Sequence, residues 1–264
     1  MITSTGNQRV KELLQLQKKS KARNQSGVFL AEGTRMVMEA PKKRVHKIYV
    51  SESYLKKYDK ELKEKGFLPE VLSDTVFDYV SDTKTPQGIL AVIRQMDYRL
   101  EEILNQESAH ILVLDNLQDP GNVGTIFRTA EAAGVTGILM SKDCADIYNP
   151  KTIRSTMGAV YRMPFVYLDD VTAGIAAVKK HGIQVYAAHL DGKNAYDRED
   201  YRKGTAFLVG NEGNGLRQEV ADCADVWVRI PMAGQVESLN AAVAATVLMF
   251  EASRQRRENE GDCI

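Results

Sequence analysis

The sequence has few cysteines, few histidines and no long apolar run, and each shortage excludes a class of protein. Its three cysteines, Cys144, Cys223 and Cys263, lie far apart, so they form neither a disulfide framework nor a Cys-x-x-Cys pair. None of the four histidines has metal-ligand spacing to another histidine or to a cysteine. The chain contains no run of about 18 apolar residues, and its first residues contain no apolar signal segment. We therefore expect a cytoplasmic protein with no metal site and no membrane-spanning segment.

Several common catalytic motifs are also absent. No strand is followed by Gly-x-Gly-x-x-Gly, and the chain contains no Gly-x-x-x-x-Gly-Lys-Ser/Thr loop. Gly-x-Ser-x-Gly is missing as well. These absences disfavour a Rossmann dehydrogenase, a classical methyltransferase, a P-loop nucleotide hydrolase and an α/β-hydrolase.

The charges are distributed unevenly, although the formal net charge is zero. Residues 1–96 contain 18 Lys and Arg against 11 Asp and Glu, whereas residues 97–264 contain 17 against 24. Within residues 1–47 the ratio is 11 to 3. Such an asymmetry is typical of a segment that binds a polyanion, and a solvated lysine-rich surface is the alternative.

Short apolar runs alternate with helical patterns along the whole chain, which predicts an α/β fold. Residues 1–95 form one small α/β domain, beginning with an amphipathic helix at 7–20 and a basic loop at 18–24. Residues 96–108 are a linker or a bridging helix. The alternation restarts at 109–264 and ends in a long alanine-rich helix.

Three loops that follow strands carry the polar chemistry, and ligands in open α/β sheets bind at such strand ends. The first contains the turn Asp119-Pro-Gly-Asn122 and leads into a helix bearing Arg128. A helix N-terminus and an arginine can bind phosphate together, although an ordinary loop–helix junction has the same pattern.

The second loop is rich in glycine, and the third loop leads into a helix. Residues 208–216, LVGNEGNGL, place Glu212 among three glycines, which permit close backbone approach to a ligand. In residues 230–257 a Pro- and Gly-containing loop ends at Ser238-Leu-Asn240, where serine and asparagine are natural helix caps. A glycine-rich turn and a tightly packed core helix are the structural alternatives.

These blocks, in this order, resemble the three motifs of the SpoU-type RNA ribose 2′-O-methyltransferases of the SPOUT superfamily. The resembling segments are Asp119-Pro-Gly-Asn-Val-Gly with Arg128-Thr-Ala, then 209–216, then 230–244. Residues 29–33 resemble, more loosely, the family's substrate-binding domain, which is similar to ribosomal protein L30e. The resemblance implies an α/β fold with a C-terminal deep trefoil knot, a mostly parallel sheet and a smaller N-terminal L30e-like domain.

The resemblance also implies an activity, a cofactor and site residues. The implied reaction transfers a methyl group from S-adenosyl-L-methionine to a ribose 2′-hydroxyl, with rRNA (23S rRNA in particular) as the expected substrate, in a homodimer that pairs through the catalytic domains. The implied catalytic residues are Arg128, Asn122, Glu212, Ser238 and Asn240. The implied cofactor-binding residues are Val209, Gly210, Asn211, Gly215, Ile230, Met232, Ala233, Leu239 and Asn240.

Arginine is almost never deprotonated in proteins, so we expect Arg128 to hold a phosphate and orient the hydroxyl rather than act as a base. The basic N-terminal segment supplies the expected RNA contacts, namely Lys18, Lys19, Lys21, Arg23 and Arg35. Two alternatives stay open at this point. One is a tRNA-directed enzyme of the same family, and the other is a non-catalytic RNA-binding or ribosome-assembly protein on the same scaffold.

Overall fold

The structure is a computed structural model that describes residues 1–260, so Cys263 lies outside the described residues. The described chain forms two compact units, residues 1–96 with 146–161, and residues 97–145 with 162 onwards. The segment 146–161, which the sequence placed with the second domain, groups with the first unit. Its aromatic side chains explain this, because Tyr148 stacks on Phe29 with ring centroids 4.7 Å apart and the Tyr161 hydroxyl donates to the Met36 carbonyl at 2.9 Å.

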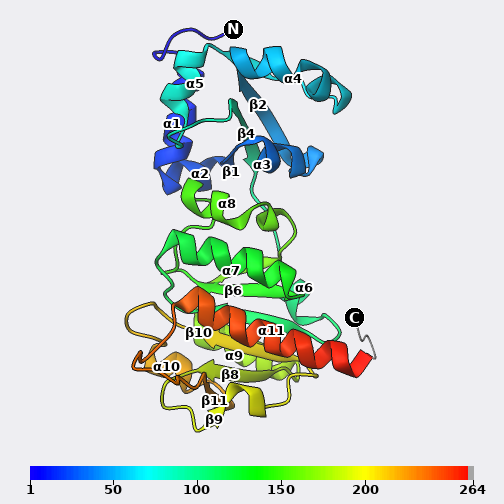
Figure 1. Ribbon diagram of the computed structural model, residues 1–264, viewed down its shortest axis with the longest axis vertical. Coiled ribbons are helices and arrows are strands. Elements are labelled where there is room, and N and C mark those ends of the chain that lie inside the picture. The colour runs from blue at the N-terminus through cyan, green and yellow to red at the C-terminus, as the bar shows by residue number, and fades with distance from the viewer. Residues whose placement is uncertain (261–264) are drawn as a thin grey trace. The chain divides into compact units, whose positions relative to one another are not determined.

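The first unit is a small α/β layer structure (Figure 1). Its sheet has the order β1-β4-β2-β3, in which β4 is antiparallel to β1 and β2. Helices α1 and α5 contribute apolar side chains to one core with the sheet. The elements are α1 (Gln8–Lys18), α2 (Ser20–Ser26), β1 (Val28–Glu32), α3 (Thr34–Glu39), η1 (Lys42–Arg44), β2 (Val45–Ser51), α4 (Glu52–Glu64), β3 (Glu70–Leu72), α5 (Asp74–Val80), β4 (Ile89–Arg94), α8 (Pro150–Thr156) and η2 (Ala159–Tyr161).

The predicted basic loop at 18–24 is wrong, because most of it belongs to helix α2. Arg23 is the reason: its side chain is only 3% exposed and points back at the preceding helix. Its guanidinium donates to the carbonyls of Leu16 and Gln17 at 2.7 and 3.2 Å, near the C-terminus of α1, and to Asp146 at 2.5 Å. Gly27, with φ of 63°, then ends α2 in the left-handed conformation that glycine adopts without strain.

The second unit contains a seven-stranded sheet of order β7-β6-β5-β10-β8-β11-β9, and every neighbouring pair is parallel. The predicted α/β fold with a mostly parallel sheet is confirmed. The elements are α6 (Leu100–Leu104), β5 (His110–Leu114), α7 (Pro120–Ala132), β6 (Gly137–Ser141), β7 (Phe165–Leu168), α9 (Val171–Lys180), β8 (Gln184–Ala188), β9 (Asn194–Ala195), η3 (Tyr196–Arg198), β10 (Thr205–Val209), α10 (Gln218–Ala221), β11 (Val226–Arg229) and α11 (Ala241–Glu260).

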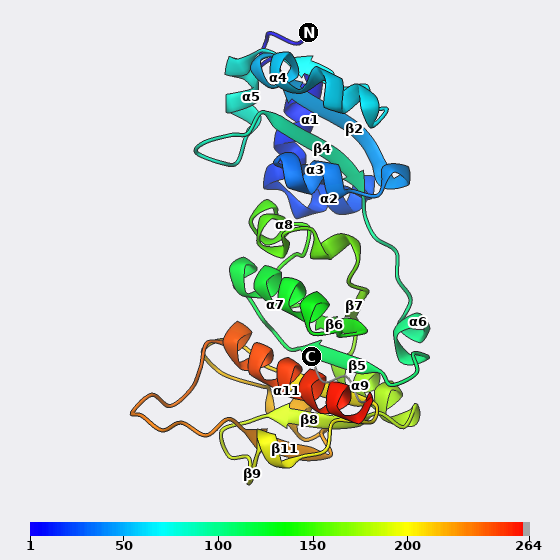
Figure 2. The ribbon, with the colours of Figure 1, turned by 45° about the vertical axis from the view of Figure 1, so that its right-hand side comes forward.

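Helices cover both faces of this sheet. Apolar side chains of α6, α9 and α10 form one buried cluster with alternate residues of the central strands. On the other face α7 and α11 lie side by side and in contact (Figures 1 and 2). Because all strands run in the same direction, the loops that leave their carboxyl ends share one edge of the sheet.

Two short elements and one helix boundary differ from the sequence-based expectation. Strand β9 and helix α10 have two and four residues and were not predicted. Helix α7 begins at Pro120, so the Asp-Pro-Gly-Asn turn is its first turn. Within residues 1–260, no helix is both long and apolar enough to cross a lipid bilayer.

Candidate functional site

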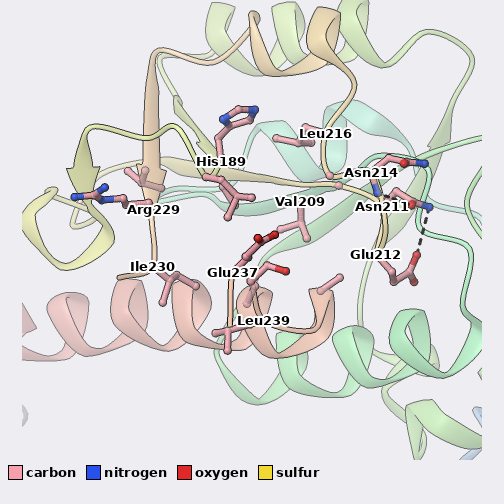
Figure 3. Close-up of a pocket in the computed structure, with 18 of the residues that line it drawn as sticks. His189, Val209, Asn211, Glu212, Asn214, Leu216, Arg229, Ile230, Glu237 and Leu239 are labelled. Atoms are coloured by element: carbon pink, nitrogen blue, oxygen red, sulfur yellow. Dashed lines mark hydrogen bonds between the residues drawn. The ribbon is translucent and has the colours of Figure 1, made fainter. Parts of the chain in front are cut away.

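A cavity of about 370 Å³ opens at the carboxyl ends of three adjacent strands, β10, β8 and β11 (Figure 3). Its volume falls within the range of small-molecule sites. Residues after β8, the loop after β10 and the segment 228–239 form its walls, and the first turns of α11 close it. The parallel sheet therefore brings together segments that are up to 60 residues apart in the chain.

Most of the predicted cofactor-binding residues line this cavity. Those that do are Val209, Gly210, Asn211, Gly215, Ile230, Met232 and Leu239, together with the predicted catalytic residues Glu212 and Ser238. Ala233 and Asn240 are not among the lining residues. Ala233 lies on the exposed part of the 231–240 segment, whereas Asn240 is drawn away from the cavity because it caps α11, accepting from the Ala242 N–H at 2.9 Å.

The glycine loop after β10 is a tight turn that only glycine permits at two positions. Asn211 and Gly215 exchange backbone hydrogen bonds of 2.8 and 3.0 Å, and Gly215 has a φ of 69°. A Cβ added to Gly210 would lie 2.2 Å from the Gly215 carbonyl carbon. The loop thus folds back on its own backbone, and a side chain at position 210 would force it apart.

Glu212 fixes this loop to the start of helix α7. Its carboxylate accepts hydrogen bonds from the backbone N–H groups of Gln118 (3.4 Å) and Asp119 (3.1 Å) and from the Asn122 side chain (3.0 Å). Partial burial raises the pKa of Glu212, but these hydrogen bonds outweigh it and leave the pKa below its usual value. Glu212 is therefore a structural carboxylate that stays ionised near neutral pH.

The same network continues to the third block. The Asn240 side chain donates to the Asn122 Oδ1 at 3.1 Å, and the Asn122 amide donates to Glu212. Each of the three residues belongs to a different block. Asn122 is 90 positions from Glu212 and 118 positions from Asn240 in the chain. The three blocks found in the sequence therefore meet in one hydrogen-bonded assembly beside the cavity.

A second contact joins the segment that follows β5 to the segment that follows the glycine loop. Asp115 directly follows β5 and is fully buried, and Arg217 lies just past the glycine loop. The Arg217 backbone N–H and Nε donate to the Asp115 carboxylate at 3.1 and 2.9 Å. This pair could not be predicted from the sequence, because nothing in a spacing of 102 residues indicates contact.

Arg128 stands apart from the cavity of its own chain. It is the ninth residue of α7 and is exposed, and it makes no hydrogen bond or ion pair with the rest of the chain between residues 1 and 260. Arg128 is not close to the helix N-terminus, because the Asp-Pro-Gly-Asn turn that was expected to precede the helix is itself the first turn of α7. The Asn122 N–H at that terminus is already bound by the Asp119 side chain at 2.8 Å.

Four charged or titratable residues of the lining were not predicted from the sequence. His189 and Asp191 follow β8, Arg229 ends β11, and Glu237 precedes the predicted Ser238. The rule that ligands lie at the carboxyl ends of strands also applies to β8, so residues 189–191 could have been found from the sequence. The His189 ring packs on Trp227 with centroids 4.2 Å apart.

The predicted RNA-contact residues of the first unit divide into exposed and buried side chains. Lys18, Lys19 and Lys21 are exposed. Arg35 is 59% exposed and donates to Glu39 one helical turn away at 2.7 Å. Arg23 contradicts its prediction, because its donors are committed to α1 and Asp146 inside the unit.

A model of the SpoU rRNA Methylase family matches residues 109–250, a segment that contains the cavity and all three loops. The chain belongs to the SpoU rRNA methylase family. A model of the MRM3-like substrate binding domain matches residues 7–91. The family resemblance stated from the three motifs is thereby confirmed.

Relatives of the SpoU family match nearly the whole chain. The 23S rRNA (guanosine(2553)-2'-O)-methyltransferase RlmP of Bacillus subtilis strain 168 is 35% identical over 251 residues, covering 94% of this chain and 97% of the relative. The AdoMet-bound rRNA methyltransferase from Sinorhizobium meliloti has a TM-score of 0.84 and 32% identity, covering 96% and 97%. The SpoU methyltransferase AviRb from Streptomyces viridochromogenes, in complex with AdoMet, has a TM-score of 0.84 and 28% identity, covering 96% and 100%.

Proposed function

We propose that this protein transfers the methyl group of S-adenosyl-L-methionine to a ribose 2′-hydroxyl of rRNA, in the large-subunit 23S molecule. The observation that carries the proposal is the hydrogen-bonded assembly of Glu212, Asn122 and Asn240, which joins the three SpoU blocks beside one cavity. The 23S rRNA assignment is supported by the 35% identity to the 23S rRNA methyltransferase over nearly the full length of both chains.

The residues around the cavity fit the cofactor. The tight turn at Gly210 presents backbone rather than side chain to the cavity, and the apolar residues Val209, Ile230 and Leu239 line its wall. Such a lining suits an adenosine, because a nucleoside needs apolar contact and a few backbone hydrogen bonds. When bound, S-adenosylmethionine supplies a methyl group on a sulfonium, which is already a good electrophile.

The protein's own task is then to orient a poor nucleophile. A ribose hydroxyl must lie in line with the methyl group and lose its proton as the new carbon–oxygen bond forms. Arg128 keeps its proton, so we assign it the role of holding the RNA phosphate and orienting the hydroxyl, whose proton leaves to water. Glu212, Asn122 and Asn240 hold the loops, and Ser238 lines the cavity where it can contact substrate.

We further propose a homodimer that pairs through the catalytic unit. Arg128 is exposed on α7 and does not line the cavity of its own chain. The neighbouring helix α11 exposes Val243 and Phe250, at 48% and 42%, seven positions apart on one face. Exposed apolar side chains at this spacing are typical of a helix that packs against a partner. A second copy would cover them and would supply Arg128 to the first copy's cavity.

RNA binding and methyl transfer are assigned to different parts of the chain. Residues 1–95 hold the RNA substrate, and the second unit, residues 97–145 with 162 onwards, carries the methyltransferase site. The exposed Lys18, Lys19 and Lys21 support the first assignment, since phosphate contacts depend on accessible cations. An enzyme that modifies rRNA acts where ribosomes are assembled, so the cytoplasm is the compartment we propose.

The deciding experiment maps ribose methylation in RNA from cells with and without this protein. We expect one 2′-O-methyl position of 23S rRNA to disappear with the gene and to return with the wild-type chain but not with Arg128→Ala. Loss of a tRNA position instead would move the substrate to tRNA. Loss of a base methylation would refute the ribose assignment, and an unchanged methylation map would leave RNA binding without catalysis.

A further inference from the structure

The cavity is lined by five charged or titratable side chains, namely His189, Asp191, Glu212, Arg229 and Glu237. Glu212 holds the loop at the start of α7, and Asp191, which is 85% exposed, lies 3.8 Å from His189. Arg229 ends strand β11 and is exposed to solvent. Glu237 is exposed like Arg229, but it is the carboxylate of the lining that has no hydrogen-bond or ion-pair partner among residues 1–260.

Glu237 is a carboxylate without a partner in the described chain. It makes no hydrogen bond and no ion pair with any residue from 1 to 260, although its neighbours in the lining are mostly apolar. Figure 3 shows it beside Val209 and Leu239, both of which the sequence assigned to the cofactor. Arg229 and His189 share the lining but form no ion pair with Glu237, and a carboxylate that lines a cavity without an ion-pair partner favours a cationic ligand there.

We propose that Glu237 makes the cavity discriminate the charged cofactor from its uncharged reaction product. This inference rests on the proposed function. Methyl transfer breaks the sulfur–methyl bond and leaves the bonding electron pair on sulfur, so the sulfonium becomes a neutral thioether. A carboxylate at the cavity wall attracts the first species and not the second. Glu237 is itself exposed to solvent, so water partly screens this attraction, and the apolar lining residues Val209, Leu239 and Leu248 limit that screening on the cavity side.

The cavity should therefore bind S-adenosylmethionine in preference to S-adenosylhomocysteine. The cofactor and S-adenosylhomocysteine share every other group, so contacts with adenine, ribose and the amino-acid tail cancel in the ratio of their dissociation constants. Only an interaction that depends on the charge at sulfur changes that ratio. Glu237 is therefore a specificity-determining residue whose effect appears in binding as well as in turnover.

The test measures, by isothermal titration calorimetry, the affinities of the full-length protein for S-adenosylmethionine and for S-adenosylhomocysteine. For Glu237→Gln we expect the affinity for S-adenosylmethionine to fall about fivefold, as for a partly screened charge pair, while that for S-adenosylhomocysteine changes by less than about twofold. Glu237→Asp should retain most of the wild-type ratio. Asp169→Asn is the matched control, since it removes one carboxylate next to β7 at the opposite edge of the sheet.

The outcomes separate this inference from the proposed function. If the wild-type protein binds neither compound, the cofactor assignment itself fails. If the wild-type protein binds both, and Glu237→Gln weakens both equally or leaves both unchanged, the inference alone is overturned. A second readout is product inhibition of methyl transfer, which should become stronger relative to cofactor binding in Glu237→Gln and stay at the wild-type level in Asp169→Asn.

Discussion

At the scale of single residues, chemically similar cations have different roles in the first unit. Lys18, Lys19 and Lys21 are exposed, whereas Arg23, two residues further on, is buried. Its planar guanidinium can satisfy two carbonyls and a carboxylate at once, which a lysine cannot do. Sequence alone treats these residues as one basic cluster, but only the lysines are available to a phosphate.

This difference predicts two separable phenotypes. Arg23→Ala leaves Asp146 without its cation, so we expect the free energy of unfolding of the first unit to fall by on the order of 3 kcal/mol. The triple variant Lys18→Ala, Lys19→Ala and Lys21→Ala should unfold within about 0.5 kcal/mol of the wild type. Chemical denaturation measures both.

RNA binding should show the reverse pattern. The triple lysine variant should bind rRNA fragments more weakly, and the slope of log affinity against log salt should fall by about 0.7 to 0.9 for each phosphate that a lysine no longer neutralises. Folded Arg23→Ala protein should keep the wild-type slope. An unchanged slope in the triple variant would show that the RNA lies on another surface.

At the scale of elements, the long helix α11 is attached at both ends. Near its start Asn240 reaches the first block, and near its end Arg256 donates to the carbonyls of Ser108 and Ala109, which precede β5, at 2.7 and 3.1 Å. Beneath this contact lies His110, the first residue of β5. Burial, followed by the nearby Arg256 charge, lowers the pKa of His110 to about 3.

The buried histidine predicts acid sensitivity of the second unit. Its Nε2 has no hydrogen-bond partner among the described residues, so the folded state keeps it neutral while the unfolded state binds a proton below pH 6.5. His110 therefore does not change the free energy of unfolding above about pH 7. As the pH falls from 6.5 towards 3, the free energy of unfolding decreases because the unfolded state takes up a proton and the folded state does not. In His110→Phe, where the ring still packs near Phe207, this loss should disappear.

The measurement is the free energy of unfolding as a function of pH for both proteins. Between about pH 5.5 and 4 the wild type should lose stability relative to His110→Phe by about 1.4 kcal/mol per pH unit. Above pH 7 the two curves should run parallel. Parallel curves throughout would mean that His110 takes up a proton in the folded protein.

At the scale of the whole molecule, the proposed dimer makes a prediction about mixtures. Gly210→Ala should abolish cofactor binding, because its Cβ would meet the Gly215 backbone at 2.2 Å. Arg128→Ala keeps the cavity and loses the cation. Neither homodimer should transfer methyl groups, but a heterodimer has one complete site if Arg128 acts across the interface.

Equal amounts of the two inactive variants, unfolded and refolded together, should therefore recover about a quarter of wild-type methyl transfer, since half the dimers are mixed and each has one working site. The control mixes Gly210→Ala with itself at the same concentration. Failure to recover activity, with mixed dimers verified by two different affinity tags, would place Arg128 in the site of its own chain.

The sequence by itself determined the order and kind of most elements, because apolar periodicity and glycine, proline and asparagine boundaries are local signals. It also indicated Val209, Gly210, Glu212 and Leu239 as site residues, because each block is a short contiguous run that resembles a SpoU motif. The family's fold came from those motifs, since alternation of strands and helices alone predicts an ordinary doubly wound sheet.

Only the tertiary structure decided which distant residues meet. The pairing of Asp115 with Arg217, the burial of Arg23 against Asp146 and the entry of Glu237 into the cavity lining depend on strand order and on packing across the sheet. Charge and exposure are properties of the folded surroundings, and a side chain's identity does not specify them. For this reason the motifs identified the site, and the fold decided which side chains form it.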